Sequence, residues 1–310
     1  MIVFVALLCV LGFGFDAFYM GVGGGYVPVG SLMALGVGTV SASVGYFRGD
    51  RAVLAATAAR PLDEVEAAAD DASKLKVRQL RNVVDEMSIA AGLPPPAVYV
   101  VPDEDPNAFA TGRGPGHASI AVTRGLLETL DREELQGVVA HEMSHIRNLD
   151  VRLMTVVAAL TGAVALLADW ARRGMTWGGG PRKNDDRRGG GLAGVVFFAV
   201  WIVAILLAPL VARMLATMVS RRREYLADAT GAELTRNPLG LARALEKLEE
   251  AAEPTRAIKQ GSAHLCIADP LGRQINLRTG FWSDIFASHP PMAARIAALK
   301  AMAFQGEGPK

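Results

Sequence analysis

Long apolar runs alternate with amphipathic segments along this chain. Residues 1–20 are almost continuously apolar, and a second apolar run covers residues 27–47. Each run is long enough for one helix across a bilayer core of about 30 Å. Two further apolar runs follow at residues 153–170 and 192–218. The pattern therefore predicts two pairs of hydrophobic helices with a polar region between the pairs.

The first apolar run has competing interpretations. A cleaved signal peptide is one, but the run lacks a basic N-terminal region and an obvious small-residue cleavage site. Asp16 interrupts the run, so we expect it near the membrane surface or, alternatively, as a functional carboxylate within the membrane. Gly21 and Gly25 belong to the turn of a helical hairpin, or their spacing forms a helix-packing face.

The stretch between residues 48 and 150 has the pattern of a soluble α/β region. Three segments are predicted to be helical: 52–59, 62–69 and 74–91. The last of them has an apolar stripe that is expected to face the core: Val77, Leu80, Val83, Val84 and Met87. Three short strands are predicted at 98–101, 107–112 and 118–122. A small sheet therefore precedes the next helix.

That next helix is predicted to begin after Asp131. The Asp131 side chain can cap the helix while Glu134 reciprocates from the third helical position. Apolar residues then recur at helical spacing: Leu130, Leu135, Val138, Val139, Met143 and Ile146. The helix carries the sequence His141-Glu142-Met143-Ser144-His145.

The two histidines of this sequence lie one helical turn apart on the same face. Their separation allows both imidazoles to bind one Zn²⁺, and Glu142, offset around the helix, can take a proton from a water molecule. Glu224 and Asp228 are four residues apart later in the chain, again on one helical face. Glu224 would complete a His₂Glu set for one zinc per chain, and Asp228 could accept the free ring N–H of a ligand histidine. Alternatively, the two carboxylates form a solvated acidic pair balanced by arginines 221–223.

Other candidate residues lie on either side of these motifs. A strand near a protease metal can hold an extended substrate by main-chain hydrogen bonds, or it can be a purely structural hairpin. Its candidate substrate-binding residues are Asn107, Ala108, Phe109, Ala110 and Thr111. His289 and Arg295 could donate to a tetrahedral oxyanion, or they anchor the C-terminal helix. His117 and His264 are expected to be surface or structural residues.

The C-terminal part is predicted to contain helices at 238–251 and 291–302 and a strand at 263–267.

Composition narrows the class of protein. The chain is 51% hydrophobic with a mean hydropathy of +0.26, which is high for a soluble enzyme and low for a protein made only of membrane spans. The net charge of +1 gives no basic surface for nucleic acid, and no P-loop pattern indicates a nucleotide. Two cysteines cannot form a disulfide framework, which fits a reducing compartment.

We therefore predict a mainly α integral-membrane protein with a small β-sheet, in which a zincin-like metalloprotease domain is tethered by about four hydrophobic helices. Arginines flanking the spans place the catalytic domain on the cytoplasmic side of the cell membrane, although the basic loop 171–191 opposes this topology. The predicted divisions are a transmembrane hairpin (1–47), a first catalytic part (48–150), two further spans (151–219), a second catalytic part (220–304) and a disordered tail (305–310).

Four motifs together resemble the HtpX family of bacterial membrane zinc metalloproteases, relatives of the CAAX prenyl proteases: DPNAFATGR, VVAHEMSHIRNLDV, RRREYLADATGAEL and SHPPMAARIAAL. The resemblance implies endopeptidase action on misfolded or damaged membrane proteins in envelope quality control under stress. It implies zinc bound by His141, His145 and Glu224, with Glu142 as general base and Asp228 beside a ligand. His289 and Arg295 match positions where relatives stabilise the transition state.

Two other functions compete with this one. A CAAX-type prenyl-protein protease has the same chemistry, but that class has more spans than this chain supplies. A non-catalytic membrane adaptor with a structural zinc is the second alternative. Structural zinc sites normally close the fourth position with Cys or His, and no such residue stands at suitable spacing here.

Overall fold

The computed structural model describes residues 28–156, 221–251, 265–268 and 290–305, together with Val5, Cys9 and Asp16. The chain divides into two compact units, Met1–Phe47 with Leu160–Met214 and Arg48–Ala159 with Leu215–Lys310. Of the helices within the described residues, none is both long enough and apolar enough to cross a membrane.

Several predictions concern residues outside the described ranges. They concern the first predicted span and the turn that follows it, the greater part of both later spans and the loop 171–191. They also concern His264, His289 and the tail after Gln305.

Helix α2 spans Val29–Ala56 without interruption. The helix predicted over 52–59 is confirmed for residues 52–56, which form the C-terminal end of α2, whereas residues 57–59 lie beyond the helix. Near the start of α2, the Asp16 carboxylate accepts hydrogen bonds from the Ser31 amide at 2.8 Å and from the Ser31 hydroxyl at 2.7 Å. A carboxylate in this position satisfies and stabilises the N-terminal turn of a helix.

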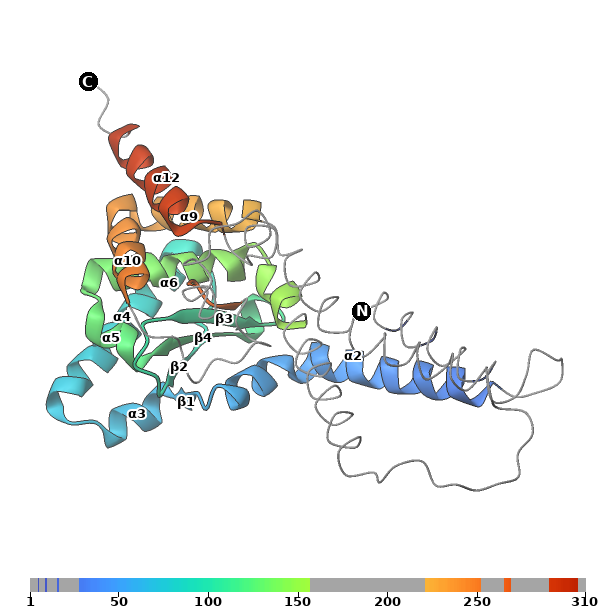
Figure 1. Cartoon of the computed structure of the whole chain (residues 1–310). Helices are drawn as coiled ribbons and strands as arrows, with labels where there is room; N and C mark the ends of the chain where they lie inside the picture. The colour runs from blue at the N-terminus through green and yellow to red at the C-terminus, as the bar shows by residue number, and fades with distance from the viewer. Residues whose placement is uncertain are drawn as a thin grey trace, which may run out of the picture. The chain divides into compact units, whose positions relative to one another are not determined.

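The sheet has four strands in the order β1-β2-β4-β3. They are β1 (Arg60–Pro61), β2 (Ala97–Val101), β3 (Ala108–Gly112) and β4 (Ala118–Thr123). β2 and β4 are parallel, whereas β1–β2 and β3–β4 are antiparallel. The three predicted strands are confirmed, and β3 lies at the edge of the sheet (Figure 1).

The other described helices all belong to the unit formed by Arg48–Ala159 and Leu215–Lys310. They are α3 (Leu62–Ala68), α4 (Asp71–Ala91), α5 (Arg124–Thr129), α6 (Arg132–Arg147), α9 (Arg221–Thr235), α10 (Pro238–Glu250) and α12 (Met292–Gln305). A 3₁₀ turn at Pro115–His117 leads into β4. The predicted stripe of α4 is confirmed as part of the hydrophobic core. The α4 helix begins a turn earlier than predicted because Asp70 accepts a hydrogen bond from the Ser73 amide and caps it.

Helix α6 is the centre of the unit. The predicted capping box between Asp131 and Glu134 is confirmed. One side of α6 contacts β3 and β4, and α4, α9 and α10 pack around the rest (Figure 1). Every residue from Gly137 to Ile146 is buried, so polar side chains in this stretch lie inside the protein. Buried polar groups need partners, which makes the polar residues of α6 the candidates for chemistry.

We expect Gly137→Ala to destabilise the fold, because α10 crosses α6 closely at this residue. A Cβ atom at Gly137 would lie 2.7 Å from the Leu241 amide nitrogen, and backbone atoms cannot rotate away. Overpacking of this kind costs about 1–3 kcal/mol, measurable as a lower unfolding midpoint. Gly116→Ala is the control, because a Cβ there meets nothing within 4 Å. Equal stability of the two variants would contradict the close helix crossing.

Candidate metal centre

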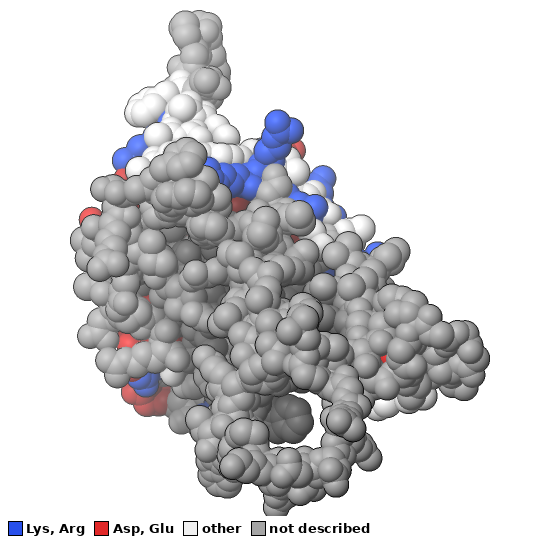
Figure 2. Space-filling view, turned by 45° about the vertical axis from the view of Figure 1, so that its right-hand side comes forward, with Lys and Arg blue, Asp and Glu red and all other residues white. Residues whose placement is uncertain are grey.

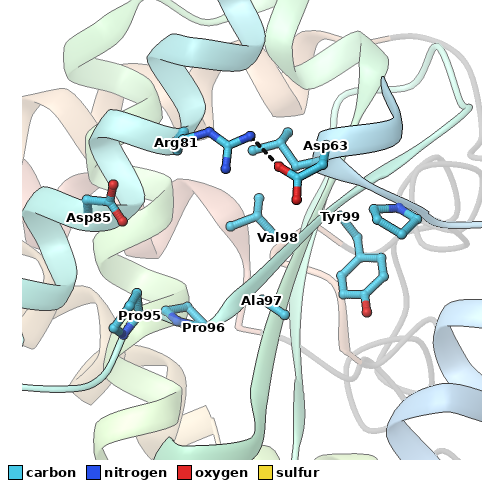
Figure 3. Close-up of a pocket in the computed structure, with 10 residues that line it drawn as sticks. Asp63, Arg81, Asp85, Pro95, Pro96, Ala97, Val98 and Tyr99 are labelled. Carbon is cyan, nitrogen blue, oxygen red and sulfur yellow. Dashed lines mark hydrogen bonds and ion pairs between the residues drawn. The ribbon is translucent and has the colours of Figure 1, made fainter. Parts of the chain in front are cut away.

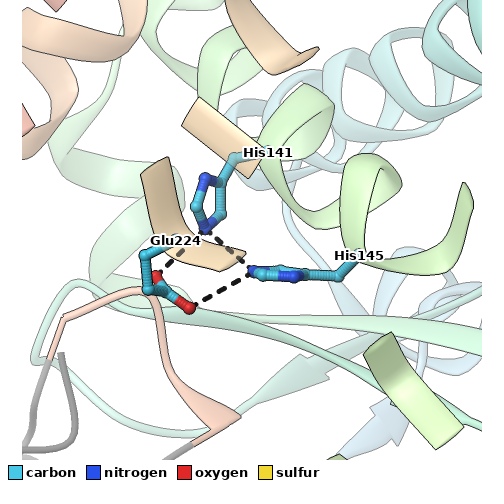
Figure 4. A group of neighbouring side chains, drawn as sticks. All are labelled: His141, His145 and Glu224. Carbon is cyan, nitrogen blue, oxygen red and sulfur yellow. Dashed lines mark hydrogen bonds and ion pairs between the residues drawn. The ribbon is translucent and has the colours of Figure 1, made fainter. Parts of the chain in front are cut away.

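Three potential metal ligands converge between α6 and α9. His141 and His145 come from α6 and Glu224 from the first turn of α9, and their ligand atoms all lie within 4.8 Å of one another. The two Nε2 atoms are 3.2 Å apart, and the Glu224 carboxylate lies 3.7 Å from His141 Nε2 and 3.6 Å from His145 Nε2 (Figure 4). The structure therefore brings together the three residues that the sequence predicts.

These separations fit a small tetrahedral cation. Ligand atoms around a Zn²⁺ with bonds of about 2.0–2.2 Å lie about 3.3–3.6 Å apart in a tetrahedral site. The three observed separations, 3.2, 3.6 and 3.7 Å, are close to this range. All three residues are at most 2% exposed, so water does not compete with a cation for the three ligand atoms. The donor set therefore fits a divalent metal such as zinc.

Glu142 is buried next to this cluster. Its exposed fraction is 1%, and neither carboxylate oxygen has a hydrogen-bond partner among the described residues. Burial raises the pKa of Glu142 to about 7. A carboxylate with such a pKa can exchange a proton near neutral pH, as a general base must.

Asp228 lies beside the first histidine. Its Oδ1 atom is 2.9 Å from His141 Nδ1, and Arg295 binds the same carboxylate through Nε at 2.8 Å and Nη2 at 2.7 Å. Burial alone would raise the pKa of Asp228, but the Arg295 guanidinium and His141 together lower it to about 2. Asp228 is therefore ionised and placed to accept the Nδ1–H of His141.

Arg295 is completely buried and its guanidinium contacts protein groups. Besides Asp228, it donates from Nη1 to the Ile267 carbonyl at 2.9 Å and lies 3.6 Å from Glu224 Oε2. These contacts anchor α12 to α9 and to residues 265–268, as one of the two predicted alternatives requires. The oxyanion role of Arg295 stays a prediction, as does that of His289, which lies outside the described residues.

The predicted substrate-binding segment forms most of edge strand β3. All of the residues from Asn107 to Thr111 are buried. The Asn107 side chain donates from Nδ2 to the Ala268 carbonyl at 2.9 Å, and the Ile267 backbone amide donates to the Ala108 carbonyl at 2.9 Å. Phe109 also forms a β-bridge with Cys266. Residues 265–268 therefore cover the outer edge of β3 at Ala108 and Phe109. The role of β3 in substrate binding stays a prediction.

Two residues of the site were not predicted from the sequence. Asp150 is 4% exposed, and its Oδ2 atom lies 3.3 Å from His145 Nδ1. Arg223 donates from Nη1 to Asp150 Oδ1 at 2.7 Å. The available signal was weak: Asp150 follows His145 by five residues, beyond the end of the helix, and Arg223 belongs to a run of three arginines.

We expect metal affinity to fall as the pH is lowered. Burial lowers the pKa of His145, but Asp150, Glu224 and Glu142 outweigh this and raise the pKa above its ordinary value. Only the neutral imidazole binds a metal, so affinity is full above this raised pKa and is lost as the pH falls through it. Chelator competition between about pH 8 and about pH 5 measures the effect. A metal affinity that is constant across this range would contradict the assignment of His145 as a ligand.

A separate cavity of about 430 Å³ lies between α3, α4 and β2 (Figure 3). Its lining includes Asp63, Arg81, Asp85 and Tyr99. Arg81 donates to Asp63 at 2.6 Å and to Glu66 at 2.9 Å, so its charge is already balanced. None of the residues that line this cavity belongs to the His141 cluster, which remains the candidate catalytic site.

Comparisons with known proteins identify the family of this chain. The sequence profile of Peptidase family M48 matches residues 74–303. The chain is 42% identical over 259 residues to a "Protease HtpX homolog" of Thermoanaerobacter pseudethanolicus, covering 84% of this chain and 80% of the relative. It is 38% identical to a protein of the same name from Streptococcus uberis, covering 96% of each.

One solved structure, the crystal structure of S. mikatae Ste24p, is similar in fold. The TM-score is 0.50 at 17% sequence identity, and the similarity covers 95% of this chain and 62% of that chain. At this identity the likeness concerns the fold alone. The family match and the full-length relatives carry the assignment: the chain belongs to peptidase family M48 and is an HtpX-like metalloprotease.

Proposed function

We propose that this protein is a zinc-dependent endopeptidase, tethered to the cell membrane by several spans, that cleaves unfolded or damaged membrane proteins from the cytoplasmic side. The proposed peptide hydrolysis rests on one observation: the ligand atoms of His141, His145 and Glu224 form a buried cluster, and Glu142 is buried next to it. The substrate class rests on the resemblance of the sequence motifs to HtpX proteases.

The residues divide the work of amide hydrolysis. A zinc ion held by His141, His145 and Glu224 would polarise the scissile carbonyl and make water more acidic. Glu142 takes a proton from the attacking water and returns it to the leaving amine. Asp228 lies 2.9 Å from His141 Nδ1, where its carboxylate can orient the ring so that the Nε2 atom faces the cluster.

The membrane topology is supported by the distribution of arginines. Arg48, Arg51, Arg152, Arg221 and Arg222 are exposed and flank the apolar segments. Lys and Arg side chains also gather on the described part of the face in Figure 2. Basic residues next to spans favour the cytoplasmic side.

The test uses the full chain purified in detergent. We expect stoichiometric zinc, cleavage of an unfolded model protein, no cleavage of the same protein when folded, and loss of activity on chelation that zinc restores. His141→Ala should lose both zinc and activity. A purified wild type that holds no metal, or that cleaves equally after chelation, would refute the proposal. Recovery of the chain in a soluble fraction without detergent would refute the membrane tether.

A further inference from the structure

The second histidine of the cluster has its own carboxylate and arginine. His145 Nδ1 lies 3.3 Å from Asp150 Oδ2, and Arg223 Nη1 donates to Asp150 Oδ1 at 2.7 Å. The same arrangement, with different residues, exists at His141, where Asp228 lies beside Nδ1 and Arg295 binds Asp228. Each ring thus has a carboxylate at its Nδ1 atom, on the side opposite the Nε2 atom that faces the cluster.

A tight turn after α6 places Asp150. Leu149 has φ of +61°, a left-handed conformation that bulky residues rarely adopt. The turn is closed by hydrogen bonds from Asn148 N to Ser144 O at 2.9 Å and from Leu149 N to Ile146 O at 3.2 Å. Asp150 then starts the next helical stretch with its carboxylate directed back toward His145. Strained backbone of this kind persists where the surrounding contacts fix it.

Arg223 connects this turn to the third ligand. It immediately precedes Glu224 in the first turn of α9, and 73 positions separate it from Asp150 in the sequence. The Asp150–Arg223 ion pair therefore joins the end of the segment that carries both histidines to the start of the helix that carries Glu224.

We infer that Asp150 and Arg223 are positioning residues of the metal centre. Asp150 accepts the Nδ1–H of His145 and so sets the tautomer and direction of the ring. Arg223 holds Asp150 and fixes the first turn of α9, so that Glu224 and His145 meet at the distance the cation needs. This inference rests on the proposed metal site.

A merely structural ion pair would affect folding without affecting the metal, so the experiment measures the two separately. The full chain is purified in detergent as wild type, Asp150→Asn, Arg223→Gln and Arg223→Lys. Metal affinity is measured by competition with a chromophoric chelator, ligand geometry by the visible spectrum of the Co²⁺-loaded protein, and stability by thermal unfolding without metal.

Asp150→Asn is expected to lower metal affinity about 10–100-fold and to alter the Co²⁺ spectrum, as loss of a partner behind a ligand histidine does. Arg223→Gln should lose about tenfold, at the lower end of this range, and Arg223→Lys should recover part of the loss because it retains the charge.

Lys247→Gln is the matched control. Lys247 donates to Glu134 at 2.7 Å, and Glu134 is another buried carboxylate on α6, at the end away from the cluster. Its loss should lower stability and leave metal affinity unchanged.

Metal affinity in Asp150→Asn equal to that of a stoichiometrically loaded wild type would overturn the inference and leave the proposed function standing. An equal loss of affinity in Lys247→Gln would also overturn it, because the effect would then be general. A wild type that binds no metal would refute the proposed function as well. If Asp150→Asn does not fold, the two Arg223 variants decide by the same criteria.

Discussion

Replacing Glu142 by glutamine is expected to lower kcat for peptide cleavage by about 10²–10⁴-fold, the usual contribution of a general base. The substitution preserves the size of the side chain, which is buried next to the cluster, but removes its ability to take a proton. Since Glu142 is not one of the three converging ligands, zinc content should stay stoichiometric. Single-turnover cleavage of an unfolded protein and metal analysis of the same sample measure the two quantities together.

Glu233→Gln provides the control for this experiment, because Glu233 is an exposed carboxylate on α9. Its activity should equal that of the wild type. If Glu142→Gln cleaved as fast as the wild type with the same zinc content, Glu142 would not be the base. Loss of zinc together with activity would instead assign it a role in holding the metal.

Replacing Arg295 by alanine is expected to destabilise the protein by about 3–5 kcal/mol, because the variant leaves a buried carboxylate without its cation. Arg295 is fully buried, and it binds Asp228 through two hydrogen bonds and the Ile267 carbonyl through a third. Chemical unfolding of the detergent-solubilised chain gives the free energy of unfolding.

Arg243→Ala removes a comparable ion pair at the surface, that of Arg243 with Glu133, and should cost at most about 1 kcal/mol. A similar loss of unfolding free energy in the two variants would contradict the prediction that the buried ion pair stabilises the protein more than the surface pair. Arg295→Lys separates the two predicted roles of Arg295. A folded, metal-loaded Arg295→Lys with a lower kcat and an unchanged KM would favour contact with the transition state over anchoring.

Elements specified by local sequence were predicted well. The α6 helix has a capping box and an apolar repeat within sixteen residues, and both work without help from the rest of the chain. Two short elements were missed. β1 has two residues and depends on pairing with the distant strand β2, whereas α5 has six residues and is capped by its neighbour Thr123. Neither is long enough to give a periodic signal.

The same distinction holds for the site. Spacing along a helix identified His141, His145, Glu224 and Asp228, because residues four apart share a face. Asp150 was missed because it reaches His145 only through a left-handed turn at Leu149. The hydrogen bond between Asn107 and Ala268 joins residues 161 positions apart, and no local pattern predicts such a contact.

Each histidine of the cluster is followed by a carboxylate and an arginine, and the charges of these groups do not cancel. Of the residues that the structure describes, six ionisable side chains surround the two histidines: Glu142, Glu224, Asp150, Asp228, Arg223 and Arg295. With neutral histidines and at a pH above the Glu142 pKa of about 7, four carboxylates and two guanidinium groups leave a formal charge of −2, which one divalent cation cancels.

Without the cation, that negative charge lies in the interior, where an uncompensated charge is costly. Metal binding is therefore expected to contribute to folding itself, by about 4 kcal/mol when free metal exceeds the dissociation constant a thousandfold. The amount of folded protein in the cell should then follow zinc supply, so that metal starvation would remove this protease by unfolding as well as by loss of activity.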